Sequence, residues 1–472
     1  MTEAGLTLPT VTRPRMRIVI PLVVGCAFFM EGLDSTMIGV SIPAMARSLG
    51  ENPLRLNLVI TSYLLSLAVF IPVSGWIADR LGARTVFCTA LLIFTTGSAL
   101  CGLSTNLPML VVMRVVQGFG GAMMTPVGRL ILLRSFPRSS LVSAMNWMTI
   151  PAMIGPTVGP IVGGFLTTYL SWRAIFYLNI PIGLTGAALA LWLFEDFRAP
   201  APTRFDLGGF AMAGVGLFLL EMALENVGRP MIAPAVGYAF FPAALALLAL
   251  YVCHARHSRA PVLDLSLLRI RTFRIGTLNG GLCRMGLDAT PLLIPLLFQV
   301  GFGMSAVQSG LLSFSSSLGA MCVRTGSRVL LRALGFRAVL TFGAVLSAAV
   351  IAVFALLRPD TPVGLIVTCV LLSGCVRSIQ YMGLNTISFA DVPSAQLSRS
   401  TSFSGVIQQL ARGFGVALGA ALLALVAGEG RVTVEDFRIV FVLVALLPLF
   451  SAVGFLSLSA QDGGEVSGHR TA

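Results

Sequence analysis

Long apolar stretches recur along almost the whole chain, and they exclude most soluble folds. Each holds roughly 20 largely apolar residues, which is enough for one helix to cross a bilayer. The stretches predict an all-α polytopic membrane protein with fourteen transmembrane helices. Their approximate bounds are 17–40, 56–78, 85–104, 107–132, 141–169, 174–194, 207–225, 234–253, 274–300, 306–326, 337–357, 362–388, 403–427 and 437–459.

The composition also indicates a membrane protein. Of the 472 residues, 56% are hydrophobic and 11% are charged, and the mean hydropathy is +0.90. Soluble domains carry about 25% charged residues. The basic residues behind the net charge of +13 are all Arg, because the chain contains no Lys. A phosphate-binding P-loop requires a Lys. A pump of that ATP-driven class is therefore excluded, and we expect coupling to an ion gradient or to a partner.

The positions of the Arg residues predict how the chain is threaded. With the N-terminus placed in the cytoplasm, the cytoplasmic flanks of the spans carry about three times as many Arg as the opposite flanks. This bias predicts that both termini are cytoplasmic. It also assigns the basic charge to helix ends, so we expect no nucleic-acid partner. No CxxC pair and no His/Asp cluster indicates a metal site.

A charged, glycine-containing link joins the second and third spans. It reads G-W-I-A-D-R-L-G-A-R and contains Gly75, Asp79, Arg80, Gly82 and Arg84. A carboxylate in such a link can dock on a helix N-terminus and on a neighbouring Arg, forming a contact that makes and breaks. We interpret the link as a cytoplasmic gate. The simpler alternative is a turn that follows the positive-inside rule.

A related link lies between the tenth and eleventh spans. It reads G-S-R-V-L-L-R-A-L-G-F-R, from Gly326 to Arg337, and lacks the acid, with Leu331 preceding Arg332. Corresponding segments in two halves are a transporter feature. We therefore predict two six-helix bundles, 17–194 and 261–459, separated by two inserted helices in 195–260. Cytoplasmic tails are predicted at 1–16 and 460–472.

Three further motifs lie within the predicted spans. L-D-S-T-M-I-G-V-S-I-P in the first span contains Asp34, and R-V-V-Q-G-F-G-G-A in the fourth contains Arg114 and Gln117. The fifth span contains G-P-T-V-G-P-I-V-G-G, in which glycines at four-residue spacing allow close helix packing and prolines bend the helix. Its motif residues are Gly155, Pro156, Gly159, Pro160, Gly163 and Gly164.

Together these motifs resemble the major facilitator superfamily, in particular the fourteen-span drug:proton antiporters of EmrB and QacA type. The segment R-S-I-Q-Y-M-G-L-N-T-I-S-F-A-D-V-P, from Arg377 to Pro393, is similar to the MdtD branch of multidrug exporters. The resemblance implies a protein of the bacterial inner (plasma) membrane. It implies that the link with Asp79 latches the two halves, that Arg114 is connected with proton transfer, and that the fifth span carries the antiporter motif.

Charges inside the spans need a reason, because each costs roughly 2.5–3.5 kcal/mol on insertion scales. Glu31 and Asp34 are three residues apart on the first span, and Arg114 lies at a similar depth on the fourth. We predict that the two carboxylates carry the exchangeable proton and that Arg114 modulates it. The alternative is a static ion pair that packs the two helices.

Further polar residues inside the spans are candidates for a substrate cavity. They are Gln117, Arg284, Asp288, Arg377, Gln380 and Asn385. Arg284 and Asp288 are four residues apart, so mutual neutralisation is an equal alternative for that pair.

The leading functional interpretation is proton-coupled efflux of drugs or other small amphipathic molecules by alternating access. The expected partners are the substrate, protons and the lipid bilayer, with a proton gradient in place of any cofactor. The sequence identifies no accessory export protein. One alternative is an exporter of an organic anion on the same fold, because the spans contain four Arg but only three deeply placed carboxylates. Another is a membrane sensor without transport. An enzyme is disfavoured, since no nucleophile is placed beside a His.

Overall fold

A computed structural model describes residues 16–136, 138–196, 205–228, 234–258, 261–393, 396–428, 432–459 and 461–463. Within these residues the chain is helical and contains no strand. The predicted tails 1–16 and 460–472 lie almost wholly outside them. Fourteen stretches among the described residues are long and apolar enough to cross a membrane. The predicted fold class is therefore confirmed.

The first bundle contains α1 (Met16–Leu49), α2 (Leu58–Leu81), α3 (Ala83–Gly102), α4 (Leu107–Ser135), α5 (Arg138–Tyr169), α6 (Ala174–Tyr177) and α7 (Asn179–Leu193). The inserted helices are α8 (Leu207–Gly228) and α9 (Pro234–His257). The second bundle contains α10 (Arg271–Arg274), α11 (Gly280–Leu296), α12 (Ala306–Val353), α13 (Val363–Ile387), α14 (Leu397–Ala427) and α15 (Val434–Phe455). Short helical turns are η1 (Arg55–Asn57), η2 (Leu265–Arg269), η3 (Ile275–Asn279), η4 (Leu297–Gly301) and η5 (Phe354–Leu356).

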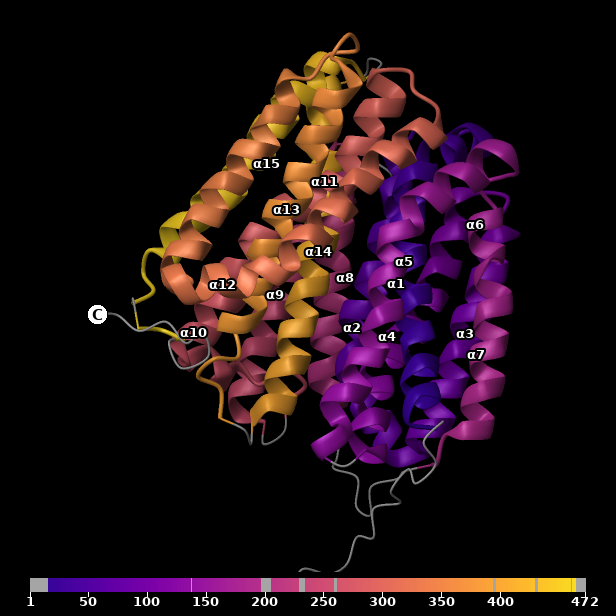
Figure 1. Cartoon of the computed structure of the whole chain (residues 1–472), viewed down its shortest axis with the longest axis vertical. Coiled ribbons are helices and arrows are strands. Elements are labelled where there is room, and N and C mark those ends of the chain that lie inside the picture. Colours follow the sequence, from indigo (N-terminus) through magenta and orange to yellow (C-terminus); the bar gives the residue numbers. More distant parts are fainter. Residues whose placement is uncertain are drawn as a thin grey trace, which may run out of the picture.

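The two bundles stand side by side, the first in indigo to magenta and the second in orange to yellow (Figure 1). They meet along two seams, one between α2 and α14 and the other between α5 and α12. The inserted helix α8 packs against both α2 and α14. We call the side on which α1 begins the inner side, and the opposite side the outer side.

Two glycines with left-handed backbone end helices in corresponding links. Gly82 has φ 99° and separates α2 from α3, and Gly335 has φ 74° and breaks the long helix α12 between its two spans. Only glycine adopts such φ values without strain. Arg332 lies three residues before Gly335, as Asp79 lies three residues before Gly82. When the two links are aligned on these glycines, Arg332 therefore takes the position of Asp79. The second link therefore carries a reversed charge where the first carries its acid.

Glycines on α5 bring it into backbone contact with α1. A methyl group at Gly155 would lie 2.3 Å from the Phe29 carbonyl oxygen, and one at Gly163 would lie 2.8 Å from Met37 Cα. The same arrangement recurs in the second bundle, where a methyl group at Gly415 on α14 would lie 2.4 Å from the carbonyl oxygen of Met285 on α11. The fold is thus internally repeated at the level of helix packing.

Candidate functional site

A cavity of about 1120 Å³ lies between the two bundles. Its wall comes from α1, α2, α4 and α5 on one side and from α11 to α14 on the other. The size lies slightly above the range of 300–1,000 Å³ that is usual for small-molecule pockets. Charged side chains in the wall are Glu31, Arg114, Arg129, Asp288, Arg377 and Arg412.

Contacts between the bundles close the outer side of this cavity. Gln299 in η4 donates a hydrogen bond of 2.8 Å from Nε2 to the carbonyl oxygen of Val40. A methyl group at Gly310 on α12 would lie 2.3 Å from the carbonyl oxygen of Pro160 on α5. At the inner margin, the lining residues Arg129 and Asn385 are exposed. The structure is therefore closed outward, with its cavity directed inward.

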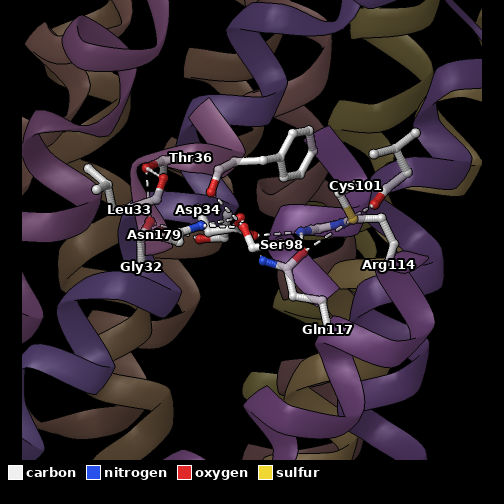
Figure 2. Close-up of polar contacts among 12 residues, drawn as sticks. Gly32, Leu33, Asp34, Thr36, Ser98, Cys101, Arg114, Gln117 and Asn179 are labelled. Carbon is white, nitrogen blue, oxygen red and sulfur yellow. Dashed lines mark hydrogen bonds and ion pairs between the residues drawn. The ribbon is translucent and has the colours of Figure 1, made fainter. Parts of the chain in front are cut away.

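Asp34 on α1 is held in a buried hydrogen-bond network behind the cavity wall (Figure 2). Arg114 on α4 forms an ion pair with it, with 2.6 Å between Nη1 and Oδ2, and also donates to Gln117 Oε1 at 2.7 Å. Gln117 donates from Nε2 to Asp34 Oδ1 at 3.0 Å, and Asn179 at the start of α7 donates to the same oxygen at 3.1 Å. Asp34 and Arg114 are each 1% exposed.

Arg114 connects this network to the cavity. Its Nε donates to the carbonyl oxygen of Val59 at 2.9 Å, and its guanidinium lies 4.2 Å from the centroid of the Tyr63 ring. Both Arg114 and Tyr63 line the cavity. A change of charge on Asp34 would therefore release or restrain a group that belongs to the cavity wall.

Glu31 lies one turn away from Asp34 in different surroundings. It lines the cavity and accepts a hydrogen bond of 2.5 Å from Thr125 on α4. It is also close enough to Asp34, Arg129 and Arg412 to interact with them electrostatically. Of the two predicted proton carriers, one is thus buried with Arg114 and the other faces the cavity.

Arg284 and Asp288 on α11 do not pair directly with each other among the described residues. Tyr381 on α13 contacts both: its hydroxyl donates to Asp288, and the Arg284 guanidinium lies 4.5 Å from its ring centroid. Arg284 also donates to Asn385 Oδ1 at 2.7 Å. Arg284 and Asp288 therefore interact electrostatically without forming a direct ion pair, and the alternative of mutual neutralisation stays untested.

The remaining cavity candidates divide between the wall and the bundle interior. Arg377 lines the cavity, and Asn385 does so at its inner margin. Gln117 and Gln380 are fully buried and do not line it, so the structure contradicts their prediction as lining residues. Gln380 donates to Cys283 Sγ and to the Leu340 carbonyl oxygen.

The link around Asp79 is held within the first bundle. Arg134 at the end of α4 donates to Asp79 Oδ1 at 2.9 Å, while the backbone N–H of Arg84 donates to Asp196 Oδ1 at 3.2 Å. The Arg80 guanidinium lies 5.3 Å from the Trp76 ring centroid. The described ion pair therefore ties α2 to α4, and among the residues that the structure describes no ion pair joins Asp79 to the second bundle.

The antiporter motif of α5 has two packed faces. Gly155, Gly159 and Gly163 lie against α1. On the other face, Gly164 approaches the Ala306 carbonyl oxygen so closely that a methyl group would lie 2.6 Å from it. Pro156 and Pro160 line the cavity. The motif therefore forms a contact within the first bundle and a contact between the bundles.

Sequence reasoning missed three residues that complete the site. Tyr63 and Tyr381 each lie beside a buried or cavity-facing Arg, and Asn179 donates to Asp34. Asn179 is one of the few polar residues in an apolar span, which is a usable signal because polar groups inside a membrane need a partner. The two Tyr residues offer no comparable pattern.

Two helical bundles around an outward-closed cavity, with a buried ion pair behind its wall, define a membrane transporter of two repeated halves. The chain belongs to the major facilitator superfamily, whose sequence profile matches residues 24–416. This membership places it among transporters and not among enzymes.

Curated relatives extend over most of the chain. A protein of Pectobacterium atrosepticum named "Putative multidrug resistance protein MdtD" is 36% identical over 92% of this chain and 94% of its own length. Relatives with the same name from Cronobacter sakazakii and Escherichia coli O139:H28 are 38% and 36% identical, over 85% and 88% of both chains. The chain is therefore an MdtD-like multi-pass transporter, as its motifs predicted.

Solved structures share the fold at low sequence identity. A D-xylose–proton symporter aligns with TM-score 0.67 and 13% identity, covering 94% of this chain and 98% of its own. The nucleoside transporter NupG aligns with TM-score 0.65 and 15% identity, over 94% and 99%. These likenesses establish the transporter fold alone.

Proposed function

We propose that this protein exports small amphipathic molecules in exchange for protons, by alternating access, across the bacterial inner membrane with both termini in the cytoplasm. The observation that carries the proposal is the Asp34–Arg114 ion pair, 1% exposed on each side and adjacent to the cavity wall. A charged pair buried in a membrane domain is expensive and marks a proton or ion pathway by default. The names of the curated relatives support export of drug-like molecules.

The geometry suggests how protonation and cavity access are linked. The Asp34 carboxylate accepts hydrogen bonds from Arg114, Gln117 and Asn179, which belong to α4 and α7. Protonation removes the negative charge that holds Arg114, so the guanidinium becomes available to the cavity. In the antiport cycle Asp34 takes up its proton on the outer side as substrate leaves. On the inner side the proton leaves toward the cytoplasm, the ion pair re-forms and substrate enters the cavity. Glu31, in the wall, is the cavity-side carboxylate of this exchange.

Alternating access requires the outer contacts to open. The Gln299–Val40 hydrogen bond and the packing of Gly310 on Pro160 close the outer side here. In the opposite state these contacts separate and the inner margin closes. Such rigid-body rocking about a central site is the usual mode of transporters with repeated halves.

The test uses proteoliposomes with an imposed pH gradient, a pH-sensitive dye, and ethidium and carboxyfluorescein as transported probes. Asp34→Asn should abolish gradient-driven accumulation of any probe that the native protein moves, and Glu31→Gln should reduce it. Asp360→Asn, at an exposed outer turn, provides the matched control. Undiminished coupled transport by both variants would overturn the proposed proton role of these carboxylates.

A further inference from the structure

The motif around Arg114 occurs a second time in the chain. R-V-V-Q on α4 contains Arg114 and Gln117, and R-S-I-Q on α13 contains Arg377 and Gln380. Each Gln is packed against a glycine of a neighbouring helix. A methyl group added at Gly97 would lie 2.9 Å from Gln117 Cα, and one added at Gly343 would lie very close to Gln380 Oε1. The two motifs therefore occupy corresponding places in the two bundles.

The two copies differ in what neutralises the Arg. Arg114 is paired with Asp34. Arg377 has one hydrogen bond in the part of the chain that the structure describes, to Ser316 Oγ at 3.3 Å, and no carboxylate within ion-pair distance. Ser313 lies in the same wall, and its buried hydroxyl is without a partner among the described residues. The wall around the second copy thus contains a guanidinium with no carboxylate partner and a buried hydroxyl with no hydrogen bond among the described residues.

Two more guanidinium groups reinforce this side of the cavity. Arg412 on α14 lines the cavity and forms no hydrogen bond or ion pair with the described residues. It is close enough to Glu31 in the first bundle and to Arg284 in the second to interact electrostatically with both. Arg284 itself bonds Asn385, which lines the cavity. The carboxylate on this side is Asp288, which accepts from the Tyr381 hydroxyl.

The charge of the cavity is therefore uneven. In the first bundle, Glu31 and Asp34 equal Arg114 and Arg129 in number, and Glu31 interacts electrostatically with both Arg129 and Arg412. In the second bundle, Arg377 and Arg412 in the wall and Arg284 behind it stand against the single carboxylate of Asp288, so the site as a whole has a net formal charge of +2. An uncompensated guanidinium at that depth is costly and calls for an anionic partner. Its planar fork suits carboxylates and other oxyanions.

We propose that the second bundle holds the anionic group of the substrate through Arg377 and Arg412, so that the transported molecules are amphipathic organic anions. This inference rests on the proposed export function and specifies its substrate class. The apolar wall residues Met153, Met321 and Leu64 would contact the rest of the molecule. The first bundle would exchange the proton, and the second would recognise the charge.

The test measures equilibrium binding to the purified full chain in detergent, without a pH gradient. The probes are naphthoate and naphthyl phosphate as anions, naphthamide as the neutral analogue and naphthylmethylammonium as the cation. At least one anion should bind more tightly than the amide and the ammonium. Arg377→Gln and Arg412→Gln should each weaken that anion about tenfold or more, the effect of losing one hydrogen bond to a charged group, while changing amide binding little.

Matched variants keep the result interpretable. Arg358→Gln makes the same change at an exposed outer position and should bind like the native protein. Arg377→Lys keeps the positive charge without the planar guanidinium and should retain part of the anion affinity. It also replaces Arg377→Gln as the test variant if that protein is not monodisperse. Preference for the ammonium, absence of anion binding, or full anion affinity in both Gln variants would overturn the inference. The binding test uses no pH gradient and is therefore independent of proton coupling. If the protein binds anions selectively in detergent but shows no proton-coupled transport in proteoliposomes, only the proposed antiport is overturned.

Discussion

Alanine at Gly310 should drive the protein out of its outward-closed arrangement. The added methyl group would lie 2.3 Å from the carbonyl oxygen of Pro160, about 1 Å nearer than ordinary contact allows. Both partners are helix backbone, so no rotamer change relieves the clash. Overpacking of this kind costs about 1–3 kcal/mol. Because the contact joins the two bundles on the outer side, the cost falls on the closed state, and the population ratio should shift about 5- to 150-fold toward outward opening.

Spin labels at the exposed outer residues Leu170 and Leu356 would report this shift as a longer inter-bundle distance, measured by double electron–electron resonance spectroscopy. The labels are attached to cysteines introduced at these two positions, in a variant whose accessible native cysteines have been replaced. Gly364→Ala is the first control, because a methyl group there meets open space. Gly155→Ala is the second, because its 2.3 Å clash with Phe29 lies within one bundle. Gly155→Ala should lower the stability of the protein without lengthening the distance between the two spin labels. An unchanged distance in folded Gly310→Ala protein would refute the reasoning.

Three further substitutions test the inner side. Asp79→Asn should lower stability by only about 0.2–1 kcal/mol, because its ion pair with Arg134 is about one-third exposed on each side. Thermal unfolding at low and high salt measures this loss, and a large loss that does not depend on salt would contradict the prediction. Gly82→Ala should destabilise the protein by about 1–3 kcal/mol because φ is 99°; unfolding in denaturant measures the loss, and native stability would count against it. Burial opposes ionisation of Asp264, yet hydrogen bonds from Ser266 and Arg399 hold the pKa of this carboxyl below its usual range. Its stabilising contribution should therefore be present at neutral pH and lost as pH falls through that lowered pKa, and pH-dependent unfolding of Asp264→Asn should lack that step.

The depth of charged residues could be predicted from the sequence. A helix rises by about 1.5 Å per residue, so Asp34 and Arg114 could be placed at one level, and the structure joins them at 2.6 Å. The glycine spacing of α5 likewise predicted close packing, which Gly155 makes on α1.

The direction of a side chain around its helix was harder to predict. Residues three apart are rotated by roughly 60° relative to each other, which separates Glu31 in the wall from Asp34 in the bundle. The same rotation places Arg377 in the cavity and Gln380 outside it. At the edge of a cavity this angle decides the role, and helix periodicity alone cannot fix it.

Contacts between distant segments were not predictable. Arg284 and Asp288 have the spacing of a neutral pair, but Tyr381, far along the chain, lies against both. Without the fold, nothing in the local pattern indicates an intervening ring.

The inserted helices make the two seams unequal. At the seam of α2 and α14, α8 packs against both helices, whereas in the described part of the chain neither inserted helix makes comparable contact with α5 or α12 at the other seam. A lipophilic molecule dissolved in the bilayer interior would therefore meet an added helical wall on one flank and only the glycine-lined junction on the other. Sideways entry from the hydrocarbon core is therefore expected at the flank formed by α5 and α12 and not at the flank that α8 covers.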